Sequence, residues 1–254
     1  MQSAQGEASY SGKPSSYADL EGEPVMMARE VANCSAEVKA GFIRKVYGIL
    51  SIQLMFTVIG AATFMFVESA RTFALSSMGV FYTAALLPIP VLFALFCYKD
   101  KHPVNLYLLS LFTVCEAYTV GVVCAVYQQQ GYGMIVLQAL LLTAAIFISL
   151  TSYVFVTKKD FSWMGGALYM GLMVLVMWSI IQMFFPIGGG LGRAVFSLLG
   201  ALLFSGYILY DTSNIMHRMG PDDYIMASIS LYLDIINLFL YLLEILRFLQ
   251  GGSD

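Results

Sequence analysis

Seven apolar runs, each about as long as a helix that spans a bilayer, constrain this chain more than any other feature of its sequence. A helix needs about 20 predominantly apolar residues to cross a hydrocarbon core roughly 30 Å thick. The connections between the runs are too short to hold a soluble catalytic domain. The sequence therefore predicts an all-α polytopic membrane protein, one bundle of seven transmembrane helices. The runs lie close to 46–67, 79–98, 104–126, 134–156, 164–184, 194–217 and 224–249.

The composition favours the same class. The chain has 254 residues, of which 59% are hydrophobic and 11% are charged, whereas a soluble domain usually carries about 25% charged residues. A soluble domain this apolar would lack the polar side chains that cover its surface. An ordinary cytosolic enzyme is therefore excluded, and the net charge of −3 gives no reason to expect a nucleic acid as partner. We expect neither an enzyme activity nor a cofactor.

The N-terminal segment differs from the rest of the chain. Residues 1–41 are rich in Ser, Glu, Gly and Ala and show no apolar periodicity, a composition typical of disorder. No apolar stretch of the kind that begins a cleaved signal peptide lies near residue 1. We expect a disordered cytosolic tail over 1–41, a bundle over 42–254, and a first span that acts as an uncleaved signal anchor.

Basic residues indicate the orientation of the bundle. With the N-terminus in the cytosol, ten of the 13 Lys and Arg residues fall on that side, and only Arg71, Arg193 and Arg247 fall on the other. Cytosolic connections usually carry the excess of Lys and Arg. The sequence thus predicts a cytosolic N-terminus and a short C-terminal tail on the other side.

Ionisable residues inside the apolar runs are the candidate functional residues. Each costs about 2.5–3.5 kcal/mol at the centre of a span, so such residues usually face the bundle interior or water. Acids outnumber bases, which suits a cation or proton pathway; an inert hydrogen-bonded network is the alternative. For Glu244 and Arg247, three residues apart, a local ion pair is favoured. The ionisable residues are Glu116, Asp211, Asp234, Glu244 and Arg247.

The last two spans each carry their polar side chains along one face. At about 100° per residue, these positions form a narrow stripe on each helix, and Leu, Ile and Phe occupy the other faces of the seventh span. We expect both stripes to line a cavity. On the seventh span the stripe is Ser230, Asp234, Asn237, Tyr241 and Glu244, and on the sixth it is Ser197, Gly200, Tyr207, Asp211 and Asn214.

Asp211 and Asp234 are equidistant from the turn that joins these spans. Gly220 and Pro221 mark that turn, and residues equidistant from the turn of a helical hairpin lie at the same depth. At the rise of an α-helix, that depth is roughly 15 Å. Two carboxylates in contact do not both ionise at low cost, so they would share a proton and titrate as a unit. The same oxygens could bind Ca²⁺ transiently.

These residues resemble a known family. The runs ILYDTSNI at 208–215, DDYI at 222–225 and LYLDIINLFLYLL at 231–243 look like the signature of the Bax inhibitor-1 family. The runs GFIRKVYGILSIQL at 41–54 and LFTVCEAYTVG at 111–121 resemble its Lifeguard branch. The resemblance covers about residues 41–249.

The resemblance implies a fold and a function. It implies six helices around a central seventh, a pH-dependent Ca²⁺ leak through endomembranes, and suppression of programmed cell death. Asp211 and Asp234 match the pH-sensing aspartates of that family. Lys99 lies near the position of a basic residue that latches the first of them, although Lys lacks the bidentate fork of Arg.

Further expectations concern the ion pathway, the ions, the partners and the location of the protein. Glu116 would belong to the ion pathway with the two aspartates, and Ca²⁺ and protons would be the permeant and regulating ions. The lipid bilayer and cell-death regulatory membrane proteins are the expected partners, and the chain is expected to be a monomer. The endoplasmic reticulum or Golgi is the expected location, with the vacuolar or plasma membrane as alternatives.

Two other function classes stay open. Level aspartates in adjacent spans are also a feature of intramembrane aspartyl proteases, although the Gly-x-Gly-Asp of those proteins is replaced by LYLD at 231–234. A non-conducting adaptor or receptor is the other class. A retinal protein would need a lysine within a span, and a membrane zinc hydrolase would need several intramembrane histidines; the apolar runs hold neither.

Overall fold

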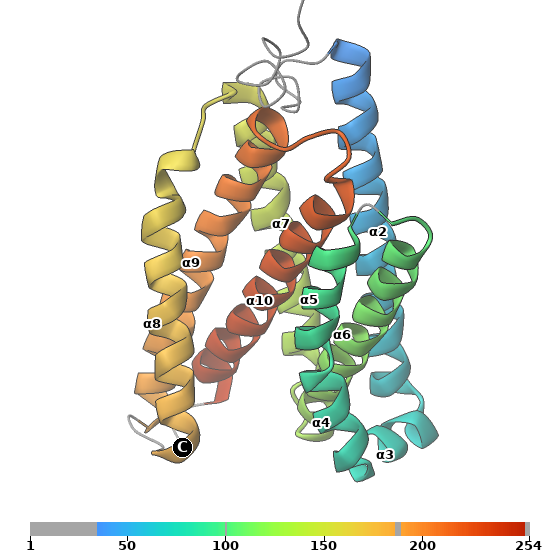
Figure 1. The fold of residues 1–254 in the computed structure, drawn as a ribbon. Coiled ribbons are helices and arrows are strands. Elements are labelled where there is room, and N and C mark those ends of the chain that lie inside the picture. The colour runs from blue at the N-terminus through green and yellow to red at the C-terminus, as the bar shows by residue number, and fades with distance from the viewer. Residues whose placement is uncertain (1–34, 100, 186–188, 252–254) are drawn as a thin grey trace, which may run out of the picture.

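The computed structural model describes residues 35–99, 101–185 and 189–251, and over these residues it is helical without strands (Figure 1). Seven of its helices are long and apolar enough to cross a membrane, which confirms the predicted class. They are α2 (Ala36–Phe66), the pair α4 (Met78–Leu86) and α5 (Pro88–Tyr98), α6 (Val104–Gln129), α7 (Gly133–Thr157), α8 (Gly165–Phe184) with the short η3 (Ser162–Met164) before it, α9 (Gly189–His217) and α10 (Tyr224–Gly251).

The first helix begins earlier than the sequence predicts. α2 begins at Ala36, and the Ser35 hydroxyl accepts a hydrogen bond from the Val38 backbone N–H at 3.5 Å, as an N-cap residue does. Residues 36–41, which the sequence assigned to the tail, are therefore helical. The rest of the predicted tail lies outside the described residues.

The connection from the first to the second span holds a helix that the apolar pattern does not predict. α3 (Glu68–Ser76) follows α2 directly, and the Arg71 guanidinium donates to the Met65 carbonyl at 3.0 Å. Arginine commonly satisfies the last carbonyls of a helix in this way. α3 is thereby attached to the end of α2.

The second span contains Pro88 and Pro90, and prolines inside a helix predict a kink. α4 ends at Leu86 and α5 begins at Pro88, the first position of a helix, where the missing N–H costs no hydrogen bond. Leu87 keeps helical dihedral angles, and its N–H donates to the Thr83 carbonyl at 2.9 Å. The span is therefore kinked rather than broken.

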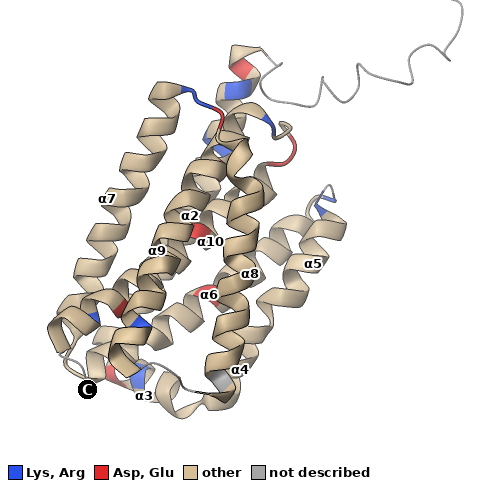
Figure 2. Ribbon diagram, turned by 90° about the vertical axis from the view of Figure 1, so that its left-hand side faces the viewer, with Lys and Arg blue, Asp and Glu red and all other residues tan. Residues whose placement is uncertain are grey.

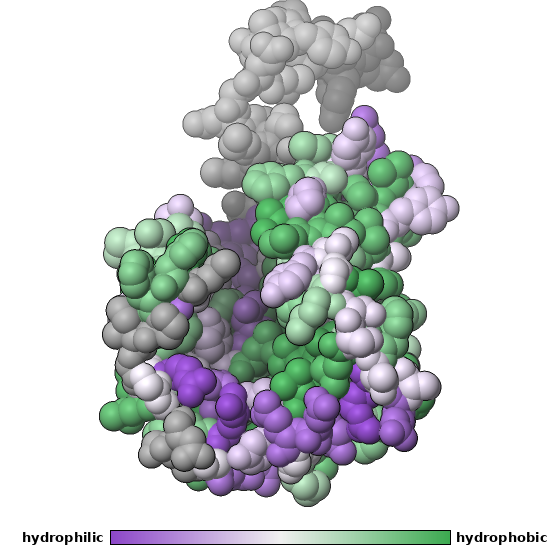
Figure 3. All heavy atoms as spheres, turned by 90° about the horizontal axis from the view of Figure 1, so that it is seen from below, coloured by the Kyte–Doolittle hydropathy of each residue, from purple (hydrophilic) through white to green (hydrophobic). Residues whose placement is uncertain are grey.

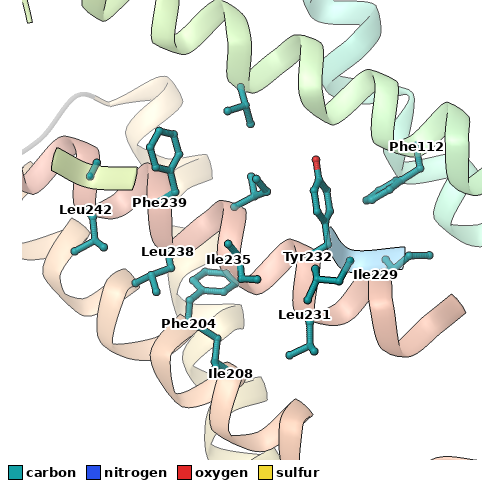
Figure 4. Packing of buried hydrophobic residues seen from close by; sticks show 14 of the residues in the cluster. Phe112, Phe204, Ile208, Ile229, Leu231, Tyr232, Ile235, Leu238, Phe239 and Leu242 are labelled. Carbon is teal, nitrogen blue, oxygen red and sulfur yellow. The ribbon is translucent and has the colours of Figure 1, made fainter. Parts of the chain in front are cut away.

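α10 forms the centre of the core. It packs against α9, α2, α7 and α6, whereas α8 packs chiefly on α9, and α4 and α5 pack chiefly on α6. In Figure 4, Leu231 and Leu238 of α10 point towards α9, and Tyr232 points to the other side, towards Phe112 of α6. The rings of Tyr232 and Phe112 meet edge to face with centroids 6.0 Å apart. A complete ring of six helices around α10 stays a prediction.

Charged residues lie mainly at the two ends of the bundle, and acidic residues also lie in its middle (Figure 2). The end where α2 begins, with the α5–α6, α7–α8 and α9–α10 connections, is here called the N-terminal side; the end with the α6–α7 turn is called the far side. Seen from the far side, hydrophilic residues gather in a band beside a hollow, and apolar surface flanks them (Figure 3). This distribution fits a bundle whose flanks face hydrocarbon.

Candidate functional site

The candidate site lies within the hairpin of α9 and α10. Asp223 precedes the first residue of α10, and its carboxylate accepts a hydrogen bond from the Gly220 backbone N–H at 3.1 Å. Its backbone carbonyl accepts the N–H of Ala227 at 3.0 Å. These bonds fix a tight turn, so the two helices run antiparallel and pack along their length.

The hairpin brings Asp211 and Asp234 together. Their carboxyl groups lie close enough to interact directly, and Asp234 is only 4% exposed. A hydrogen bond between two carboxyl groups requires that one of them carries the proton, because an ionised carboxylate has only acceptors. Two carboxyls in direct interaction inside the membrane-spanning bundle have the arrangement that sharing of one proton requires, and the sharing itself stays a prediction.

Polar oxygens remain unpaired around this pair. The Asn214 side chain, one turn from Asp211, lies beside the Asp211 carboxyl, and its Oδ1 is buried without a hydrogen-bond partner among the described residues. Asp234 Oδ2 is also buried without a partner. Two buried oxygen atoms beside the pair thus receive no hydrogen bond from a donor among the described residues.

Aromatic side chains form the next layers towards the far side. Tyr207 lies close enough to interact electrostatically with both aspartates. The ring of Tyr241 stacks on that of Phe204 at 5.8 Å and lies against Gly200, where a Cβ would come within 2.6 Å of ring carbons. Glycine is needed at 200 because the Tyr241 ring occupies the space of a side chain.

The remaining stripe residues contribute less. The Asn237 amide donates to the Leu233 carbonyl of its own helix at 2.8 Å, and Ser230 is half-buried. Glu244 accepts from the Tyr127 hydroxyl at 2.8 Å and lies 3.6 Å from Arg247. The local ion pair of Glu244 and Arg247 favoured by the sequence is present.

Glu116 lies apart from the aspartates. Among the described residues it makes no hydrogen bond or ion pair with Asp211 or Asp234; it lies near Tyr232, on the α2 and α6 side of α10. There the Tyr232 and Thr57 hydroxyls share a hydrogen bond of 2.8 Å, and the Gln53 amide donates to the Thr113 hydroxyl at 3.0 Å. The sequence did not predict this second polar cluster, whose members come from three spans.

Lys99 pairs with Asp223 rather than with Asp211. Its Nζ lies 2.9 Å from Asp223 Oδ1, and both side chains are about one-third exposed. Asp211 lies about three helical turns inside the hairpin, and an ammonium drawn that deep would lose its hydration at a cost of several kcal/mol. The structure thus gives Lys99 a carboxylate partner in Asp223, and a latch between Lys99 and Asp211 stays a prediction.

The α7–α8 connection forms a second cluster on the N-terminal side. Ser213, two residues beyond Asp211, accepts the Phe161 backbone N–H at 2.9 Å, and Arg218 lies 3.5 Å from Asp160. The backbone N–H of Ser162, which donates to Asp160 at 2.8 Å, holds the pKa of that carboxyl below its ordinary value. The connection is thus attached to α9 close to the carboxylate pair, by residues that no sequence motif marked.

The described residues hold no cluster of three or more His, Cys, Asp or Glu side chains placed to bind a metal ion. Ca²⁺ takes six to eight oxygen ligands when it is held tightly. Two carboxyls and an amide oxygen are fewer than that, and transient Ca²⁺ binding by the pair stays a prediction.

Fold and site together define a seven-helix integral membrane protein with a carboxylate pair buried between adjacent spans. Residues 39–251 match the family described as "Inhibitor of apoptosis-promoting Bax1". The chain belongs to this family, the Bax inhibitor-1 family, as its signature runs predicted.

Relatives from a plant, an animal and a virus support this family assignment. The chain is 47% identical to a BI1-like protein of Arabidopsis thaliana, over 85% of this chain and 83% of that protein. It is 41% identical to Protein lifeguard 4 of Mus musculus, over 85% of this chain and 89% of that protein. It is 40% identical to the Golgi anti-apoptotic protein of Vaccinia virus (strain Lister), again over 85% of this chain and 89% of that protein.

Proposed function

We propose that this protein is a pH-sensitive Ca²⁺ leak channel of an endomembrane and that it suppresses programmed cell death. The observation that carries the proposal is the direct interaction of the Asp211 and Asp234 carboxyl groups inside the membrane-spanning bundle. Intramembrane carboxylates commonly mark ion pathways and proton relays. The family and its anti-apoptotic names support the cellular role.

The unpaired oxygens of the pair supply the cation site. A Ca²⁺ ion that reaches this depth meets Asp234 Oδ2 and Asn214 Oδ1, neither of which has a hydrogen bond to give up. Carboxylate and amide oxygens are suitable Ca²⁺ ligands. Because so few of them converge, the ion would bind weakly enough to leave, as conduction requires.

The shared proton couples the leak to pH. Binding of Ca²⁺ between the carboxyls displaces the proton that joins them, so cation and proton compete for the same oxygens. The two carboxyls titrate as a pair. Acidification that protonates both therefore removes the negative charge that attracts the cation.

The cellular side of the proposal concerns place and orientation. The Golgi relative and the excess of basic residues on the N-terminal side support an endomembrane location with a cytosolic N-terminus. A leak in this orientation would lower the Ca²⁺ content of the organelle and leave less to be released during death signalling.

Calcium flux from proteoliposomes tests the proposal. Purified full-length protein is reconstituted with an external fluorescent Ca²⁺ indicator, and empty liposomes serve as the control. We expect a protein-dependent efflux that changes between pH 8 and pH 5. Efflux no faster than from empty liposomes would overturn the channel and favour a non-conducting adaptor.

The same carboxyl contact also suits an intramembrane aspartyl protease, in which two aspartates share a proton around a water molecule. Incubation of the proteoliposomes with fluorogenic transmembrane peptides separates the two functions. Peptide cleavage that is lost in Asp234→Asn, without Ca²⁺ flux, would favour the protease.

A further inference from the structure

A crevice of about 500 Å³ opens between α2 and α7 in the far-side half of the bundle. Its floor is buried and comes from α6 and α10, with Val120, Cys124 and Ile235 below 7% exposed. Its rims are exposed: Val58 of α2 is 43% exposed and Leu137 of α7 is 48% exposed. The crevice thus opens sideways, towards the region that hydrocarbon fills in a membrane.

Helix packing explains why side chains do not close this space. α2 and α7 each pack on α6 and α10, and far less on each other. The α2 wall carries the small side chains Ala61 and Ala62 at its centre. The two walls are therefore held apart by the helices beneath them.

The lining is apolar except for two hydroxyl groups at its inner end and the polar groups at its far-side end. Two threonine hydroxyls line the inner end, but both are already bonded: Thr143 donates to the Ala139 carbonyl at 2.7 Å, and Thr57 shares its hydrogen bond with Tyr232. At the far-side end, Gln128 and the α6–α7 turn at Gly131 and Gly133 line the opening. An occupant needs no polar group at the inner end and meets polar atoms only at the membrane surface.

The length of the crevice corresponds to one leaflet. From Gly133 to Thr143 it follows α7 for about 15 Å at the helical rise of 1.5 Å per residue. That is half of a hydrocarbon core roughly 30 Å thick. Its volume lies within the range of about 300–1,000 Å³ that is usual for ligand sites.

We propose that this crevice is a lipid site that takes one acyl chain of a phospholipid from the far-side leaflet, with the headgroup at the α6–α7 turn. The sideways opening lets a chain enter from the bilayer along its whole length. Met65 and Met134 line the site with flexible side chains that adapt to such a ligand. The site is separate from the carboxylate pair, and it does not depend on the proposed leak.

Native mass spectrometry of the full-length protein, released from phosphatidylcholine nanodiscs, tests the proposal. Wild type should retain one phosphatidylcholine per chain. Ala62→Trp, which places an indole in the crevice, should retain at least tenfold less. The matched control is Ala144→Trp on α7, an exposed position outside the lining, and it should behave as wild type. Wild type without bound lipid, a sterol in place of phospholipid, or equal retention by the two variants would overturn the proposal.

A crystallographic measurement needs no variant and so does not depend on the folding of Ala62→Trp. Wild-type protein is crystallised with phosphatidylcholine whose second chain carries bromine at mid-chain. Anomalous density between Val58 and Leu137 is expected. Bromine density distributed evenly around the bundle, with none in the crevice, would contradict the site.

Discussion

The Lys99 ammonium lies 2.9 Å from a carboxylate oxygen of Asp223, and this ion pair joins the end of α5 to the turn between α9 and α10. Asp223 also accepts the Gly220 N–H, so a single side chain both shapes the turn and attaches it to α5. The carboxylate pair of Asp211 and Asp234 lies deeper in the same hairpin. The ion pair is thereby placed to close the N-terminal side of the site.

The carboxylate pair gives the first prediction. Asp234→Asn should lower Ca²⁺ leak from proteoliposomes at pH 7.5 by about tenfold, or about 1.4 kcal/mol, and should flatten its pH dependence. The reason is that the amide keeps the shape of the side chain but removes one charge and the shared proton. Glu244→Gln on the same helix is the control, because Glu244 is already paired with Tyr127 and Arg247. Equal effects of the two substitutions would mean that the site is misplaced.

The close approach of Tyr241 to Gly200 gives a stability prediction. Gly200→Ala forces the ring to move, because the new Cβ would lie 2.6 Å from it. Overpacking of this kind typically costs about 1–3 kcal/mol, so thermal unfolding in detergent should occur at a lower temperature. At Gly48 a Cβ meets nothing within 4 Å, and Gly48→Ala should be neutral or stabilising by up to about 1 kcal/mol. Equal unfolding temperatures for both variants would refute the packing argument.

The low pKa of Asp160 gives a pH prediction. A carboxyl whose pKa is lower in the folded state stabilises the fold at pH values above its unfolded pKa of about 3.9, and it loses that contribution as the pH falls through the folded pKa. Asp160→Asn should therefore lower stability at pH 7 by under about 1 kcal/mol, because the site is exposed. The difference from wild type should shrink as the pH falls below about 3.9 and should vanish below the folded pKa of Asp160. A difference that persists there would show that the effect is not electrostatic.

Topology gives a fourth prediction. The sequon Asn33-Cys34-Ser35 lies on the side predicted to be cytosolic, with Asn33 and Cys34 outside the described residues. Protein expressed in a eukaryotic host should therefore show no mass shift after glycosidase treatment. A glycosidase-sensitive shift that disappears in Asn33→Gln would reverse the orientation.

Sequence patterns predicted the features that depend on one helix or on one hairpin. The lengths of the apolar runs predict the spans, and Pro88 predicts the kink in the second span. The equal depth of Asp211 and Asp234 in the bundle follows from the symmetry of a tight hairpin. The Glu244–Arg247 pair follows from a spacing of three residues. Each of these depends only on helix geometry and local chemistry.

Contacts between distant segments could not be predicted in this way. The pairing of Lys99 with Asp223, and that of Thr57 with Tyr232, depend on how far each helix is rotated and tilted against its neighbours. Periodicity does not set these quantities, since it identifies a polar face but not the helix that the face meets. The crevice between α2 and α7 is a property of the same packing.

The last prediction concerns what closes the hairpin. Lys99→Met and Asp223→Asn remove the same ion pair, so each should raise Ca²⁺ leak at pH 7.5. A partly exposed ion pair contributes at most about 1 kcal/mol, which limits the increase to about fivefold.

The double variant identifies the partner of Lys99. If the two residues act only on each other, Lys99→Met with Asp223→Asn should leak no faster than either single variant. All three variants should keep the decline of leak on strong acidification, because that decline comes from protonation of Asp211 and Asp234. An increase with Lys99→Met but none with Asp223→Asn would mean that Lys99 acts through another carboxylate, such as Asp211. Multiplicative effects in the double variant would show that the two residues act separately, and the ion pair would then not be what closes the hairpin.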